Sequence, residues 1–179
     1  MIEPIQIPDA TREPAAYVRA LVATLGDREP LEVLRQTPTA VRAMCVRLSD
    51  EQWRMPMAEG EWTALQVVGH LLDVEMVYGF RWRLILTEDR PAYPGYNEKR
   101  WSLLLRPGPA QLLGALEGLR AVNLAVLEGV NDDAATRSGV HGEQGEENFD
   151  LTVRKVAGHD LAHLNQLART VAAATGPHE

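Results

Sequence analysis

Five stretches of the chain space their apolar residues as a helix does. The first, residues 14–25, is short and ends at Gly26, a residue typical of a helix end. The second follows Thr37-Pro38, a pair typical of a helix start, and runs to about residue 48. Longer stretches cover 61–86, 109–127 and 151–174. The pattern therefore predicts a lead helix followed by four main helices.

The stretch 61–86 is apolar on nearly every side, which is typical of a helix at the centre of a fold. Leucine and alanine are abundant whereas isoleucine and phenylalanine are scarce, and this favours helix over sheet. We predict an all-α protein, a four-helix bundle with an extra N-terminal helix. Residues 1–29 would form the extension and residues 30–175 the bundle domain. The segments 87–108 and 129–150 are predicted to be long connections, and such loops often border a site.

Charge and cysteine content exclude several classes of partner and site. The formal net charge is −7, so nucleic acid and membrane surfaces are poor partners. The single cysteine, Cys45, excludes an intramolecular disulfide and a cysteine-based zinc cluster. The chain begins without a basic and then apolar leader, and it has no unbroken run of 18 apolar residues. We therefore expect a cytoplasmic protein.

The five histidines supply the candidate chemistry: His70, His141, His159, His163 and His178. His159 and His163 are four residues apart, so on a helix they lie one turn apart and can bind one metal ion. His70, on the central predicted helix, is the natural third donor. Three imidazoles leave a coordination position open, as in catalytic metal sites. The alternatives are a core histidine for His70 and a solvated helix face for the pair; we interpret His141 as a surface loop residue and His178 as part of the tail.

Three neighbouring polar residues are candidates for orienting these rings. Asp160 lies among apolar positions of the last helix and could accept the free ring N–H of a ligating histidine. Asp73 competes for the same role. The alternative for Asp160 is a salt bridge to an arginine of another helix. Gln166 shares the helix face of the histidine pair and either lines the pocket or faces solvent.

Two segments carry a resemblance to a known family. Glu61-Trp62-Thr63 leads into a segment from Gln66 to Glu75 that contains His70, and Gly158 to Gln166 contains the histidine pair. Together they resemble the DinB/YfiT-like superfamily of metal-binding four-helix bundles, over about residues 30–173. The resemblance implies that His70, His159 and His163 hold a metal.

The resemblance also implies which ions and reactions to expect. Nickel or zinc comes first, with iron, copper or manganese as alternatives, and a homodimer and a small-molecule substrate are expected. Some members transfer small thiols such as bacillithiol, mycothiol or glutathione to electrophiles, and others are called hydrolases. Because no general base is evident beyond Asp73 and Glu75, we favour a thiol transferase using such a thiol as cosubstrate. A metal-dependent hydrolase or a non-enzymatic, stress-inducible metal-binding protein are the alternatives.

Overall fold

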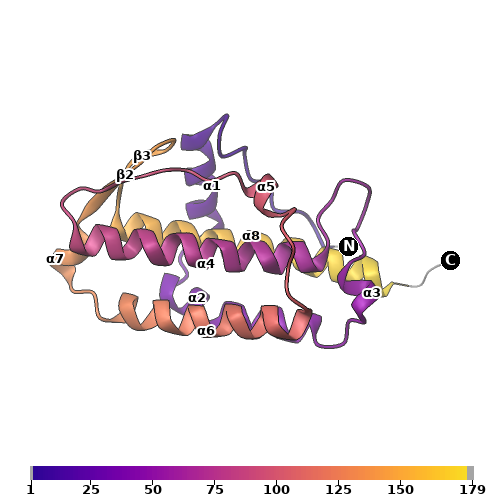
Figure 1. Ribbon diagram of the computed structural model, residues 1–179. Coiled ribbons are helices and arrows are strands. Elements are labelled where there is room, and N and C mark those ends of the chain that lie inside the picture. The colour runs from indigo at the N-terminus through magenta and orange to yellow at the C-terminus, as the bar shows by residue number, and fades with distance from the viewer. Residues whose placement is uncertain (1, 177–179) are drawn as a thin grey trace.

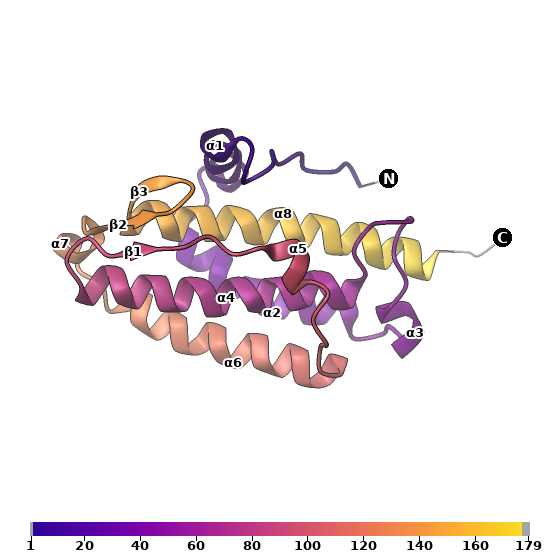
Figure 2. The same cartoon turned by 45° about the horizontal axis from the view of Figure 1, so that its top comes forward.

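Four long helices form the body of the protein in the computed structural model, which describes residues 2–176 (Figure 1). His178, interpreted above as tail, lies outside these residues. The long helices are α2 (Pro30–Cys45), α4 (Ala64–Thr87), α6 (Pro109–Glu128) and α8 (Phe149–Thr175). The lead helix α1 (Pro14–Leu25) crosses the outside of α8 (Figure 2). The all-α, four-helix bundle prediction with an N-terminal helix is confirmed.

The connections contain more structure than the sequence pattern indicates. They hold the one-turn helices α3 (Asp50–Trp53), α5 (Glu98–Trp101) and α7 (Asp132–Ala135), and the strands β1 (Ala92–Tyr93), β2 (Ser138–His141) and β3 (Gly145–Asn148). β2 pairs parallel to β1 and antiparallel to β3, so the two long loops meet in one small sheet. This sheet lies near the α7 end of the bundle (Figure 2). The segments 87–108 and 129–150 are connections as predicted, but 129–150 is not simply loop, since it contains α7, β2 and β3.

Local sequence explains where the central helix begins and what it buries. Thr63 and Gln66 form a capping box. The hydroxyl of Thr63 accepts a hydrogen bond from the backbone N–H of Gln66, and the side-chain oxygen of Gln66 accepts one from the backbone N–H of Thr63. Further along α4, Trp82 is completely buried and its indole N–H donates to the hydroxyl of Thr152 on α8.

Cys45, the last residue of α2, is a buried free cysteine, and burial raises its pKa to about 12.

The second helix does not start at Thr37-Pro38, as the sequence pattern predicts, but at Pro30. It continues through Pro38, which has no backbone N–H and leaves the carbonyl of Leu34 without its usual partner. A guanidinium nitrogen of Arg120, on α6, donates to this oxygen at 2.5 Å. A contact from another helix thus satisfies the carbonyl that the proline leaves free, which local sequence could not indicate.

Arg120 is also the centre of a buried charge cluster. The side chain of Arg120 is 2% exposed and forms salt bridges with Glu75 of α4 at 2.7 Å and with Asp160 of α8 at 2.8 Å. Burial raises the pKa of Glu75, although the charge of Arg120 opposes this shift. With its hydrogen bond to Leu34, Arg120 connects α6 to the other three long helices.

The helix that carries Arg120 is unusually apolar. By length and composition alone, α6 could cross a membrane. It packs against α2 and α4, and its buried face includes Arg120 and Asn123. The side-chain amide of Asn123 donates to the backbone carbonyl of Glu75. In this fold α6 is one of the four bundle helices, and a bundle helix can be as long and apolar as a membrane-spanning one.

We expect Arg120→Leu to destabilise the fold by about 3–5 kcal/mol, because two buried carboxylates would lose their cation. The matched control is Arg42→Leu, which removes an exposed salt bridge to Glu117 and should cost less than about 1 kcal/mol. Urea unfolding followed by circular dichroism measures both. Equal losses for the two variants would show that the buried cluster does not contribute as argued.

Candidate metal centre

Three histidine side chains converge between α4 and α8. Nε2 of His70 lies 3.0 Å from Nε2 of His159, and one ring nitrogen from each of His70, His159 and His163 lies within 4.8 Å of the other two. Two nitrogens bound to one zinc-like ion at tetrahedral angles lie about 3.3 Å apart. The spacing of the three imidazoles therefore fits a single divalent ion.

Helix packing places these rings. His159 and His163 are one turn apart on α8, and His70 faces them from α4. Beside the pair, Gly158 lets α1 approach closely, since a Cβ atom at this position would lie 1.9 Å from the backbone oxygen of Leu21. The lead helix thus covers α8 next to His159.

Gln166 is the polar neighbour that contacts the triad. Its side-chain oxygen lies 2.8 Å from Nδ1 of His163 and accepts the proton of that nitrogen when the ring is neutral, which leaves Nε2 free for a metal. Nδ1 of His70 and Nδ1 of His159 are buried without a hydrogen-bond partner among residues 2–176. One of the three rings is therefore oriented by a side-chain hydrogen bond.

Asp73 and Asp160 do not hold the histidine rings, in contrast to the sequence-based expectation. Asp73 accepts two hydrogen bonds from Arg106, at 2.7 and 2.5 Å. Asp160 forms its salt bridge with Arg120, which is the alternative raised for it above. Both carboxylates are buried, and an arginine from a distant part of the chain neutralises each of them.

Burial sets the protonation state of the triad. It lowers the pKa of His70 and His159 well below the ordinary histidine value, and the nearby His163 lowers both further. Burial also lowers the pKa of His163, with the hydrogen bond to Gln166 acting in the opposite direction. The rings are therefore neutral at pH 7, the form that binds metal ions.

Comparison with known proteins agrees with this arrangement. The family model described as the DinB superfamily matches residues 33–167. The chain belongs to the DinB superfamily. A relative from Geobacillus thermodenitrificans is 35% identical over 138 residues, which are 73% of each chain. YfiT from Bacillus subtilis is 31% identical over 149 residues, 78% of this chain and 82% of the relative.

A solved structure of Bacillus subtilis YfiT shares the fold of this DinB superfamily member. It superposes with a TM-score of 0.71 at 29% identity, covering 78% of this chain and 84% of the other. That protein is described as a probable metal-dependent hydrolase with an unusual four-helix bundle topology, and the relatives above carry the same provisional name. The metal dependence in these names and the histidine triad together support a divalent metal in this DinB superfamily member.

Glu98 is a site residue that the sequence analysis missed. It begins α5, in the connection after α4, and its Oε2 lies 4.0 Å from Nε2 of His70. Its side chain is only partly exposed, and desolvation raises its pKa. Trp62, from the loop before α4, covers another side, with its ring centroid 5.0 Å from that of His70. No local pattern distinguishes Glu98 from other loop acids, since only the folding of this connection brings it to the triad.

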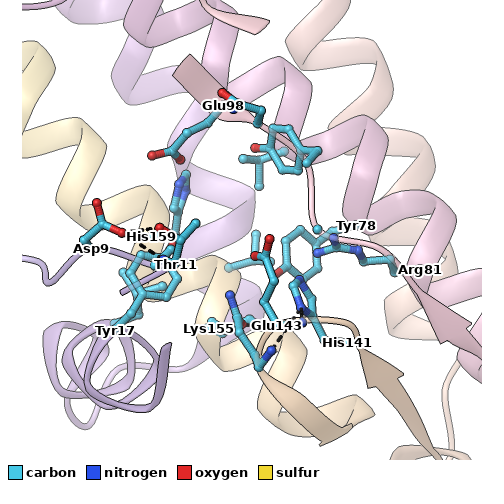
Figure 3. A pocket seen from close by; sticks show the side chains of 18 of the residues that line it. Asp9, Thr11, Tyr17, Tyr78, Arg81, Glu98, His141, Glu143, Lys155 and His159 are labelled. Atoms are coloured by element: carbon cyan, nitrogen blue, oxygen red, sulfur yellow. Dashed lines mark hydrogen bonds between the residues drawn. The ribbon is translucent and has the colours of Figure 1, made fainter. Parts of the chain in front are cut away.

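A cavity of about 310 Å³ extends from the triad along the bundle (Figure 3). His159 and Tyr17 lie at one end of the close-up, and Arg81 and His141 lie at the other. A second hollow of about 530 Å³ is lined by residues 4–10 together with His159 and His163. The candidate metal centre of this DinB superfamily member is thus accessible to a small molecule.

The interpretation of His141 as a surface residue is wrong. It lies in β2, is 4% exposed and lines the cavity. Its Nδ1 accepts hydrogen bonds from the backbone N–H groups of Glu143 and Gln144. Burial lowers its pKa to about 4, with further lowering by Arg81 and Lys155. The hairpin that buries His141 has no apolar alternation, so the sequence pattern did not show it.

We expect His141 to make the fold less stable in mild acid. Its pKa falls from 6.5 in the unfolded chain to about 4 in the fold, so between these values the unfolded chain binds more protons and stability declines as pH falls. From pH 7 to pH 5 this loss amounts to about 2 kcal/mol, and His141→Asn should lack it. Urea unfolding at both pH values, with chelator present, measures the difference. If the free energy of unfolding of the variant fell by the same amount as that of the wild type, the loss would not come from His141.

Proposed function

We propose that this protein is a divalent-metal-dependent hydrolase in which His70, His159 and His163 hold the ion and Glu98 is the general base. The observation that carries the proposal is the position of the Glu98 carboxylate, 4.0 Å from Nε2 of His70. The names of the relatives, provisional metal-dependent hydrolases, support the same reaction class.

The residues present suit such an ion. Three neutral imidazoles are ligands for zinc, nickel, copper or iron, and they leave a coordination position open. A divalent ion in this position supplies Lewis acidity and lowers the pKa of a bound water toward about 7. Of the ions that the family resemblance implies, nickel and zinc stay the first candidates, with iron, copper and manganese as alternatives. Elemental analysis of protein purified without a histidine tag identifies the ion.

Glu98 differs from the fully buried acids near the triad. Asp73, Glu75 and Asp160 are each bound to an arginine, which makes them poor proton acceptors. Among residues 2–176, no lysine or arginine nitrogen lies within 4 Å of the Glu98 carboxylate. It lines the cavity from α5, so it can accept a proton from a water beside the triad.

Thiol transfer becomes the second candidate. The sequence-based preference for a thiol transferase rested on the lack of a general base, and Glu98 removes that argument. The same open position could bind a small thiol and lower its pKa, so the two reactions are separated by experiment. Conjugation of bacillithiol, mycothiol or glutathione to electrophiles, run beside hydrolysis of esters and amides, tests both.

We expect His163→Ala to lose most of the bound metal while the helical fold persists, because apolar packing forms the core. Metal content by elemental analysis and helicity by circular dichroism measure the two effects. His141→Asn is the matched control, since His141 lies outside the triad and should keep its metal. Full metal content in His163→Ala would contradict the ligand assignment.

We expect Glu98→Gln to lower kcat for hydrolysis by roughly 10²- to 10⁴-fold, since the amide cannot accept the proton, and to leave metal content unchanged. Glu51→Gln, an exposed acid in the one-turn helix α3, is the control and should keep full activity. Ester and amide panels give the rates. Undiminished hydrolysis in Glu98→Gln would exclude Glu98 as the base, and thiol conjugation without hydrolysis would favour the transferase.

A further inference from the structure

Arg81, on α4, is a buried cation without a carboxylate. It is 3% exposed, yet among residues 2–176 no carboxylate oxygen lies within 4 Å of its guanidinium. Within the same described residues, the other buried cationic side chains each have such a partner: Arg106 has Asp73, Arg120 has Glu75 and Asp160, and Lys155 has Glu147. A buried charge normally requires a partner of opposite sign, so Arg81 lacks the anion that would compensate its charge.

The contacts that Arg81 does make hold it in place without neutralising it. One terminal nitrogen donates to the backbone oxygen of Pro94 at 2.7 Å. The guanidinium lies over the rings of Tyr78 and Tyr93, at 4.9 and 5.0 Å from their centroids. Its other N–H groups have no hydrogen-bond partner among the described residues, and Arg81 lines the cavity that leads to the triad (Figure 3). The guanidinium is therefore fixed at the end of the cavity away from His159, and its remaining N–H groups can donate hydrogen bonds to a ligand.

We infer that Arg81 binds a carboxylate group of the substrate. This inference rests on the proposed function and deepens it: the substrate is a small carboxylic acid whose hydrolysable bond lies near His159 while its carboxylate lies against Arg81. The planar guanidinium presents paired N–H groups that match the two oxygens of a carboxylate.

The remaining charges of the cavity favour a single negative charge on the ligand. Of the other basic groups that line the cavity, Lys155 is already paired with Glu147, His141 is neutral at pH 7 because its pKa is about 4, and Lys99 is exposed to solvent. Three acids also border the cavity: Asp9, Glu98 and Glu143. They would repel a dianion such as a phosphate monoester. A monocarboxylate is compensated by one guanidinium, so it fits these charges best.

The shape of the cavity indicates the body of the ligand. His70 and Arg81 are eleven residues apart on α4, about 16 Å along the helix axis. Tyr17, Tyr78 and Tyr96 line the cavity. These rings suit an apolar or aromatic body joined to the carboxylate. The volume of about 310 Å³ is typical of a site for a small ligand.

Titration calorimetry with hydrocinnamate, an aromatic monocarboxylate, tests the inference without any need for turnover. The full chain as purified should bind hydrocinnamate and should bind its neutral amide, hydrocinnamide, at least ~10-fold more weakly. Arg81→Met should weaken hydrocinnamate binding by roughly 10- to 100-fold, and Arg81→Lys should recover part of the loss because it keeps the charge. Equal affinity of the wild type for the acid and the amide would overturn the inference, and this comparison holds even if Arg81→Met does not fold.

Two further variants separate this site from the metal. Arg83→Met removes an arginine of α4 that donates to Gly79 and Asn123 outside the cavity, and it should leave the affinity unchanged. His163→Ala, which removes a proposed metal ligand, should also keep hydrocinnamate binding. Binding that is lost in His163→Ala but retained in Arg81→Met would place the carboxylate on the metal and contradict the inference. Failure of all hydrolysis assays with these binding results intact would remove the proposed reaction but not the carboxylate site.

Discussion

The guanidinium of Arg120 is the contact on which the arrangement of the bundle depends. It joins Glu75 of α4 and Asp160 of α8, and it donates to the carbonyl of Leu34 that Pro38 leaves free in α2. Asp160 directly follows His159 in the chain, so the same salt bridge fixes α8 beside the triad. Burying three charges is costly, and removing one of them leaves the others uncompensated, so the cluster constrains how the four helices can pack.

Because arginines form salt bridges with several buried carboxylates, only the remaining charged groups are free to bind or react with a ligand. Asp73, Glu75 and Asp160 are all neutralised by arginines within the bundle. Glu98 beside the triad and Arg81 at the far end of the cavity have no such ion pair with a lysine or arginine, or with a carboxylate, among residues 2–176. They have opposite signs and lie at different ends of one cavity. Such a cavity suits a ligand whose reactive bond lies beside a base and whose carboxylate lies against a cation.

Features of this protein that depend on interactions between residues near in sequence can be predicted from the sequence, whereas features that depend on distant residues cannot. Helix α1 and the three longest helices follow from apolar periodicity and from helix-end residues such as Gly26, which are local signals. The convergence of His70 with the pair on α8 follows from spacing, a central helix and family resemblance. The continuation of α2 through Pro38, the arginine partners of Asp73 and Asp160 and the approach of Glu98 all depend on residues distant in sequence. No pattern within one segment could indicate them.

Anomalous X-ray diffraction from crystals of the metal-loaded protein, collected on both sides of the absorption edge of the bound metal, locates the ion. We expect one strong anomalous peak about 2.0–2.2 Å from a ring nitrogen of each of His70, His159 and His163, with the Glu98 carboxylate on the open side. A peak bound by other residues, or no peak between α4 and α8 in protein shown to contain the metal, would contradict this expectation.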